Sequence, residues 1–162
     1  NQYKGTLRNN KISINDLMKD KVKYFKDEIG YTDIKGEGIV IKIKDSEEEL
    51  KEGQNPNDLI VHDIDILRII NDLKLFGAKA ISINGERIIS SSQIKCSGAT
   101  ITVNETTYGQ PFIIKAIGDI KSLMSHINSP DSYTTLLKDG YGIYINIKQK
   151  SDIVVNKYEK SK

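Results

Sequence analysis

The segment His62-Asp63-Ile64-Asp65 contains the densest group of side chains in the chain that could bind a ligand or take part in catalysis. An imidazole and two carboxylates side by side are able to bind a metal ion or a polar ligand. A helix is expected to begin here, so Asp63 stands where an N-cap belongs and Asp65 meets the positive end of the helix dipole. The other histidine, His126, lies far along the chain. We therefore interpret the segment as a helix cap, with a ligand contact as the alternative, and predict no metal site.

A second polar group, Asn84-Gly85-Glu86-Arg87, follows an apolar run. Asparagine and glycine tolerate positive φ, so the segment predicts a tight hairpin turn. An exposed tip would present Glu86 and Arg87 to a partner. Arginine is rare in this lysine-rich chain, and a guanidinium forks onto carboxylate or phosphate. The two interpretations are a simple turn and a turn that contacts a partner; in a ligand-binding alternative, Arg87 would join His62 and Asp65.

Signatures of catalysis and of nucleotide binding are missing from the sequence. It contains no Walker-type phosphate loop, no strand–Gly-rich loop–helix dinucleotide fingerprint, no nucleophile elbow and no zinc-protease motif. The lone Cys96 has no base beside it, so we expect a buried, inert thiol. We therefore predict no catalytic residue, no cofactor and no enzyme activity, although catalytic groups that converge from distant positions leave no local signature.

Composition narrows the class of protein further. The chain has 162 residues, of which 38% are hydrophobic and 28% charged, and its net charge is +2. That length supports one domain with its own core, and the charge balance argues against a nucleic-acid binder. With one cysteine, neither a disulfide framework nor a multi-cysteine metal site can form within the chain.

Hydrophobic periodicity predicts the elements that position these residues. Helices are expected from Ile14 to Ile29, over residues 64–76, over residues 120–127 and in a short piece after Pro130. Strands are expected over residues 39–45, 80–83, 87–89, 94–96, 99–104, 112–117 and 141–148, with residues 152–158 as a final edge strand. A loop containing Gly109 and Pro111 is expected before Phe112.

Without the first helix and the extra hairpin strands, the order becomes β-α-β-β-α-β. This order predicts an α+β fold of the ferredoxin-like type, with a mixed sheet, an inserted β-hairpin and an N-terminal helix. We expect residues 1–35 to form a tail and helix, and residues 36–162 to form a single domain. No run approaches the ~20 apolar residues that span a bilayer. Because the chain begins at Asn1 rather than methionine, we expect a longer natural protein.

Several segments together resemble one bacterial family. They are Val61–Leu67, Ile70–Leu73, Gly77–Arg87, Ile94–Gly98, Ile101–Asn104 and Pro111–Asp119. The family is domain-of-unknown-function 881, the YlxW/YlxX-like proteins, and the resemblance runs from about Gly36 to Lys148.

The resemblance implies a cellular setting but no chemistry. Members typically carry an N-terminal membrane helix, a coiled-coil stretch and then this domain on the extracytoplasmic face of the cell membrane. Their genes often lie beside cell-division genes in Gram-positive bacteria, and the family has no established activity. We therefore expect a non-enzymatic interaction or scaffold module of the cell envelope, linked to division or wall synthesis, whose partners are envelope proteins. The membrane would be reached only through an N-terminal anchor absent from this chain.

Two expectations remain open beside that function. The alternative function is a domain that senses a small-molecule or peptide ligand. Self-association is compatible with the sequence, through the N-terminal helix, which would end a membrane-proximal coil, or through an edge strand. The candidate ligand or partner contacts are His62, Asp63, Asp65, Asn84, Glu86 and Arg87.

Overall fold

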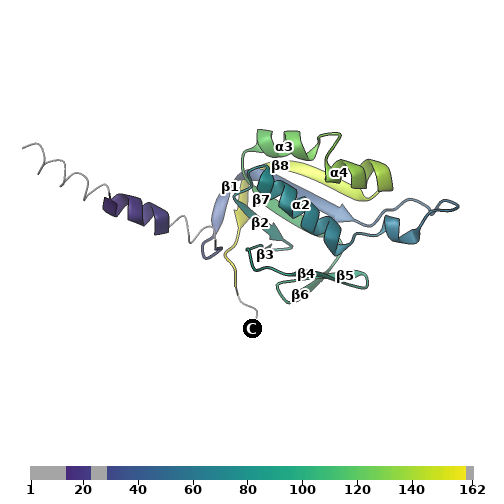
Figure 1. Ribbon diagram of the computed structural model, residues 1–162, viewed down its shortest axis with the longest axis horizontal. Helices are drawn as coiled ribbons and strands as arrows, with labels where there is room; N and C mark the ends of the chain where they lie inside the picture. The colour runs from purple at the N-terminus through teal and green to yellow at the C-terminus, as the bar shows by residue number, and fades with distance from the viewer. Residues whose placement is uncertain (1–13, 23–28, 160–162) are drawn as a thin grey trace, which may run out of the picture.

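A computed structural model describes residues 14–22 and 29–159 (Figure 1). The chain order is β1 (Ile34–Lys44), η1 (Pro56–Leu59), α2 (Asp63–Leu75), β2 (Ala80–Ile83), β3 (Glu86–Arg87), β4 (Ile94–Ser97), β5 (Thr100–Val103), β6 (Thr106–Gly109), β7 (Phe112–Ile117), α3 (Ile120–Ile127), α4 (Tyr133–Thr135), η2 (Leu136–Gly140) and β8 (Tyr144–Val155). Residues 14–22 form a helix that precedes these elements.

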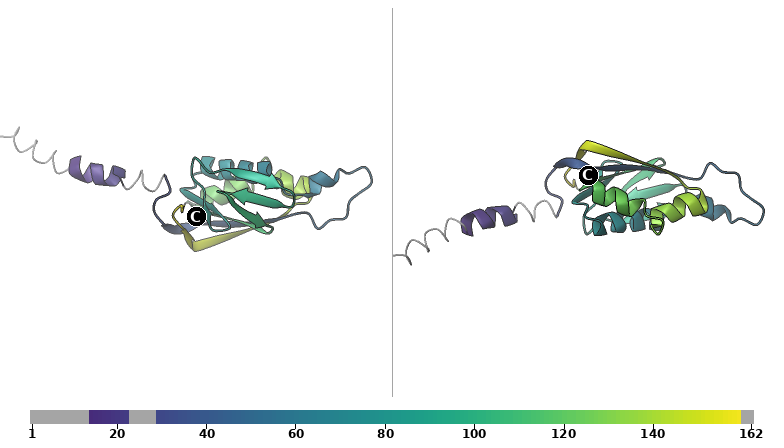
Figure 2. Two further views of the ribbon diagram at one scale, coloured as in Figure 1. Left: turned by 90° about the horizontal axis from the view of Figure 1, so that it is seen from below. Right: turned by 90° about the horizontal axis from the view of Figure 1, so that it is seen from above.

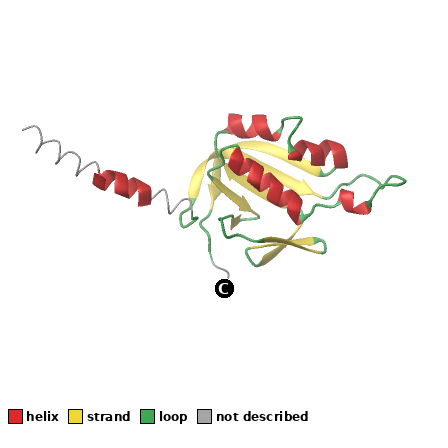
Figure 3. Ribbon diagram, viewed as in Figure 1, coloured by secondary structure: helices red, strands yellow, loops and turns green. Residues whose placement is uncertain are grey.

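The described strands form two sheets, a five-stranded one in the order β3-β2-β7-β1-β8 and a three-stranded one in the order β4-β5-β6. Helices α2, α3 and α4 lie on one face of the larger sheet (Figures 2 and 3). The α+β class is therefore confirmed. The N-terminal helix was expected to reach Ile29, and the part of that prediction on residues 23–28 lies outside the described residues, as does the tail over residues 1–13.

Each strand pairing of the larger sheet is antiparallel, so the prediction of a mixed sheet is wrong. The crossover through α2 does make β1 and β2 parallel to each other. However, β7 lies between them and pairs antiparallel with both, so no two adjacent strands run the same way.

Apolar side chains that alternate along the strands fill the space under the helices. Ile41 of β1 is opposite Ile114 of β7 and Ile147 of β8. The first two of these side chains are fully buried, and they pack in one cluster with Ile66 and Leu73 of α2. This packing fixes which face of each strand points away from the helices.

The inserted segment is larger than the predicted hairpin. It forms the separate sheet β4-β5-β6, and β6 occupies part of the expected loop before Phe112. Asn104 and Glu105 turn the chain between β5 and β6 with φ values of 49° and 73°. The sequence lacks an Asn-Gly pair there, which is why the sequence analysis did not predict this hairpin.

The last strand is continuous where the sequence predicted two pieces. β8 pairs with β1 over most of its length, with a register shift opposite the interval Gly36–Gly38. Gly38 is required at this point, because a Cβ atom there would overlap the carbonyl oxygen of Ala116 on β7. The expected domain boundary between residues 35 and 36 falls inside β1.

Candidate functional site

The first turn of α2 is held by Asp65 rather than by Asp63. α2 begins at Asp63, with His62 at the N-cap position, and Oδ2 of Asp65 accepts a 2.8 Å hydrogen bond from the backbone N–H of His62. Asp63 instead accepts bonds from the N–H groups of Ile64 (2.8 Å) and Cys96 (3.2 Å). Asp63 was expected at the N-cap position and is instead the first residue of the helix, so that assignment is wrong. The first-turn position of Asp65 is confirmed, and Asp63 links α2 to the smaller sheet.

Asp65 has a second role, because its other oxygen points into the fold. The side chain is 6% exposed, and Oδ1 accepts a 2.5 Å hydrogen bond from the hydroxyl of Tyr133 on α4. Burial, together with the hydrogen bond and the negative charge of Asp65, raises the pKa of Tyr133 to about 12. Arg68 stacks over the Tyr133 ring at 4.1 Å from its centroid and opposes that shift. Tyr133 is therefore a neutral hydrogen-bond donor at neutral pH.

A small cavity of about 190 Å³ lies beside this pair. Its lining comprises Asn57, Asp58, Ile60, His62, Asp65, Tyr133, Leu137 and Tyr141, and we call it the Asp65 pocket. His62 Nε2 lies 2.8 Å from the backbone oxygen of Asn57, so the ring is held at the rim. The pocket is large enough for a few heavy atoms and offers an imidazole, a phenol and a carboxylate for hydrogen bonding.

The Asn84-Gly85 turn forms as predicted, but the residues after it are not an exposed tip. Asn84 and Gly85 have φ values of 48° and 86°. The Asn84 side-chain oxygen accepts a 2.6 Å bond from the N–H of Ile113, which fastens the turn to β7. Glu86 is half-buried and accepts a 2.8 Å bond from the hydroxyl of Tyr108. Burial and this bond to Glu86 raise the pKa of Tyr108 to about 12.

Arg87 is buried, at 3% exposure, so the expectation of an exposed guanidinium is wrong. Its Nη1 donates to the backbone oxygen of Thr32 at 2.9 Å and to that of Asn156 at 3.4 Å. Asn104 donates to the Arg87 carbonyl oxygen at 2.8 Å. Arg87 therefore ties together the segments that precede β1 and follow β8, which a local sequence pattern cannot reveal.

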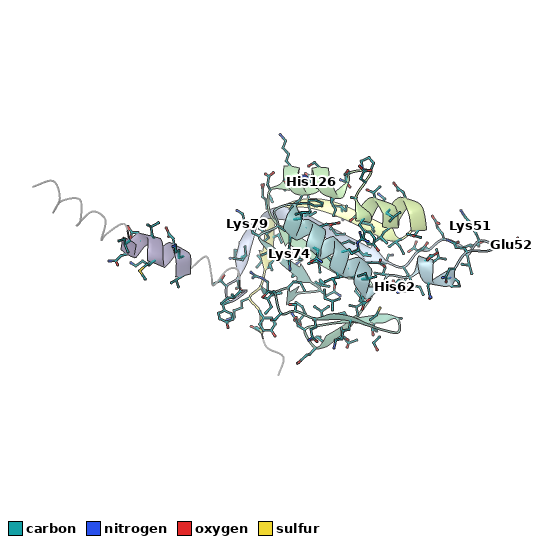
Figure 4. All side chains as sticks on the ribbon, viewed as in Figure 1. Lys51, Glu52, His62, Lys74, Lys79 and His126 are labelled. Atoms are coloured by element: carbon teal, nitrogen blue, oxygen red, sulfur yellow. The ribbon has the colours of Figure 1, made fainter. Side chains whose placement is uncertain are left out.

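The proposed ligand set of His62, Asp65 and Arg87 is not assembled. Arg87 lines a different cavity, of about 350 Å³, together with Lys74 and Lys79. Lys74 lies in the last turn of α2 and His62 just before the first, and Figure 4 shows them toward opposite ends of the helix. A helix of this length separates its ends by ~18 Å. One small ligand cannot contact both groups.

Cys96 is exposed, which contradicts the expected buried thiol. It lies on β4, at the edge of the smaller sheet, and every residue of that strand except Ile94 is exposed. The apolar character of its neighbour Ile94 was therefore a poor guide to the position of Cys96.

The face of the larger sheet that points away from the helices carries a group of lysines that sequence reasoning missed. Strand register places Lys115 of β7, Val40 of β1 and Lys148 of β8 in one row, and Ile113, Lys42 and Asn146 in the next. Lys44 lies opposite Tyr144, and Lys150 lies opposite Gly38. We call this surface the open sheet face; its lysines are Lys42, Lys44, Lys115, Lys148 and Lys150. The alternation of Lys42 with Lys44 and of Lys148 with Lys150 was the signal in the sequence.

Comparison with known proteins places the chain in a family. A family model described as a bacterial protein of unknown function (DUF881) matches residues 21–162. The chain belongs to this family. The resemblance predicted from the sequence segments is thus confirmed for DUF881.

One curated relative and one solved structure give the extent of the similarity in sequence and in fold. The UPF0749 protein YlxW of Bacillus subtilis (strain 168) is 35% identical over 113 residues, which are 70% of this chain and 48% of the relative. The chain therefore matches about half the length of this curated relative. The crystal structure of an uncharacterized conserved protein from Mycobacterium tuberculosis has a TM-score of 0.72 and 22% identity, and covers 88% of this chain and 94% of that chain. This second likeness establishes the fold alone.

Within residues 14–22 and 29–159, no helix has the length and apolar character needed to cross a membrane.

Proposed function

We propose that this DUF881 chain is a non-enzymatic interaction module of the bacterial cell envelope, on the extracytoplasmic face of the membrane, linked to division or wall synthesis. The observation that carries the proposal is β8, a twelve-residue strand at the edge of the larger sheet. On the side away from β1, its backbone N–H and C=O groups have no neighbouring strand among the described residues. Such an edge binds an extended segment of a partner through main-chain hydrogen bonds.

The side chains of β8 favour a different protein as the partner over a second copy. Two β8 edges joined in one continuous sheet would bring Lys148 and Lys150 of both copies into one surface. Like charges near one another in a sheet oppose pairing. A partner strand without clustered lysines avoids this repulsion.

Crosslinking in living cells tests the proposal. A photoreactive residue replaces the exposed Gln149 of β8 in the full-length protein, and a matched one replaces the exposed Lys121 of α3, which is not part of the strand edge. The expected result is a discrete envelope-protein adduct from position 149 and none from position 121. Equal adducts from both positions, or no adduct from position 149, contradicts the proposal.

A second variant distinguishes a partner that pairs with the β8 edge from a protein that is only close to position 149. Ser151 lies in the β8 segment between the pairs Gly36–Ile153 and Gly38–Lys150, where register with β1 is broken. Proline is tolerated at bulges and on edge strands but removes a backbone donor. Ser151→Pro is expected to keep the fold and to abolish the position-149 adduct; an unchanged adduct overturns binding at this edge.

The finer fold assignment belongs to the same proposal. Omitting β3 and the smaller sheet leaves β1-α2-β2-β7-α3-β8, and the spatial order β2-β7-β1-β8 supports a ferredoxin-like plan. In that plan β3 is an added edge strand and β4-β5-β6 is an insertion between β3 and β7.

The Asp65 pocket favours the second candidate function, the sensing of a small ligand. Its hydrogen-bonding groups surround a cavity of about 190 Å³. Thermal-shift screening of small polar compounds tests this function on the intact chain and on Tyr133→Phe. A compound that stabilises only the intact chain supports ligand sensing, and a screen without stabilising compounds contradicts it.

A further inference from the structure

The five lysines of the open sheet face lie together on three strands, β1, β7 and β8, that carry two carboxylates, Glu37 and Asp152, both at the register shift between Gly36 and Gly38. At the paired positions of β7, β1 and β8 on this face, no residue is an aspartate or glutamate. Lys44 bonds Glu47, in the loop after β1, at 3.0 Å. Among the described residues, Lys42, Lys115, Lys148 and Lys150 are not ion-paired with a carboxylate.

Packing does not account for these charges. The opposite face of the same strands supplies the core under α2, α3 and α4, whereas no described helix covers the open sheet face (Figure 2). Lys42, Lys148 and Lys150 are exposed, and Lys44 and Lys115 are half-buried. A small apolar cluster that includes Ile117, Ile153 and Val155 closes one end of this face and leaves the lysine-bearing part uncovered.

The arrangement of the charges is two-dimensional. Neighbouring strands lie about 4.8 Å apart and a strand rises about 3.4 Å per residue, so the lysines extend over roughly 10 Å by 20 Å. The half-exposed Val40 and Ile113 lie among them. An acidic peptide strand would follow a single line of this array, whereas the headgroups of a lipid leaflet form a plane of anions that meets the whole array.

We infer that the open sheet face docks on an anionic lipid bilayer. Lysine ammonium groups on long flexible stems bind headgroup phosphates as point charges without a fixed geometry, and their stems cover Val40 and Ile113. Helices α2, α3 and α4 then face away from the bilayer. This binding surface goes beyond the proposed protein partner at β8, and a bilayer on the face leaves the edge of the sheet open.

Vesicle co-sedimentation tests the inference with the whole chain. The probes are vesicles of phosphatidylglycerol and phosphatidylcholine in equal parts, and vesicles of phosphatidylcholine alone. The double variant Lys42→Gln/Lys148→Gln is compared with Lys121→Gln/Lys138→Gln, whose exposed lysines lie on α3 and η2. Both variants lose the same charge, so a difference between them reports position alone.

The chain is expected to bind the mixed vesicles and not the neutral ones. Its binding to the mixed vesicles should weaken as the salt concentration increases. Each removed lysine weakens binding about fivefold. The open-face variant should therefore bind about 25-fold more weakly, since two such factors multiply, while the control variant stays within about twofold.

Three results overturn the inference. The first is that the intact chain does not bind the mixed vesicles, and the second is that both double variants lose the same amount of vesicle binding. The third is that the intact chain binds a soluble polyglutamate peptide as tightly as it binds the vesicles, and that the open-face variant loses this peptide binding too. The last result assigns the face to an acidic polypeptide. Ser151→Pro keeps vesicle binding if the inference holds, so a failed β8 interaction and a failed membrane interaction give different results.

Discussion

The hydroxyl of Tyr133 donates a hydrogen bond to the buried carboxylate of Asp65, across 68 positions of sequence. The same carboxylate accepts from the backbone N–H of His62 at the start of α2. One side chain thus caps a helix and fastens it to α4, so the local and the long-range structure depend on each other.

Tyr133→Phe is expected to destabilise the fold by about 2 kcal/mol, because it leaves one oxygen of a buried carboxylate without its donor. Urea denaturation followed by circular dichroism measures the change. Tyr141→Phe is the control, since Tyr141 lines the same pocket but is 37% exposed. Equal effects of the two substitutions would show that the Asp65 bond contributes nothing.

Alkaline titration should reveal two tyrosines with a raised pKa. The pKa of Tyr108 and that of Tyr133 are each about 12 in the folded chain, against an ordinary value of 10.0. Between these pH values the unfolded chain releases protons that the folded chain retains, so stability falls as pH rises from about 10 and levels off above about 12.

The ultraviolet absorbance of tyrosinate measures this titration for all tyrosines together, and variants assign the signal to single residues. Tyr108→Phe and Tyr133→Phe should each remove amplitude near pH 12. Loss of amplitude near pH 10 from either variant would contradict the assigned environments, because an ordinary phenol titrates there.

Gly38→Ala is expected to destabilise the fold by about 3 kcal/mol, because the added methyl group overlaps backbone rather than a movable side chain. Gly109→Ala on β6 is the matched control: a Cβ there meets no atom within 4 Å. Thermal unfolding of both variants measures the difference. A Gly38→Ala protein as stable as the control would mean that β1 and β7 are less closely paired.

Arg87→Leu should loosen the segment after β8. The substitution removes the donor to the carbonyl oxygens of Thr32 and Asn156, and hydrogen bonds from a charged donor contribute about 2 kcal/mol. Hydrogen exchange is expected to accelerate at the N–H of Tyr158, which bonds the Gly30 oxygen at 2.7 Å. Exchange at Ile70 in the middle of α2 is the internal reference, and equal acceleration there would indicate global rather than local opening.

The sequence predicted best where a pattern repeats over a few neighbouring residues. The alternation in β1, the apolar face of α2 and the Asn84-Gly85 turn are each visible within one segment, because strand and helix periods and turn dihedrals are local properties. The first-turn position of Asp65 followed from the same local geometry, whereas the N-cap is His62 and not the expected Asp63. The matched segments were also sufficient to predict the family.

Other features depend on which strands become neighbours. The position of β7 between β1 and β2 makes the sheet antiparallel, and Arg87 is buried because the two ends of the domain meet over it. No local pattern encodes which distant segments become neighbours. The predictions of an exposed turn tip at Arg87 and of a site that Arg87 shares with His62 were therefore wrong.

The sequence by itself therefore determined the α+β class, the family and the elements with a strong period. Tertiary structure alone decided which charged residues share a surface. The lysines of β1, β7 and β8 come from distant segments, and strand register places them in one layer on the open sheet face. The physical reason is that side chains alternate across a sheet locally, whereas the order and register of strands are set by long-range packing of the core.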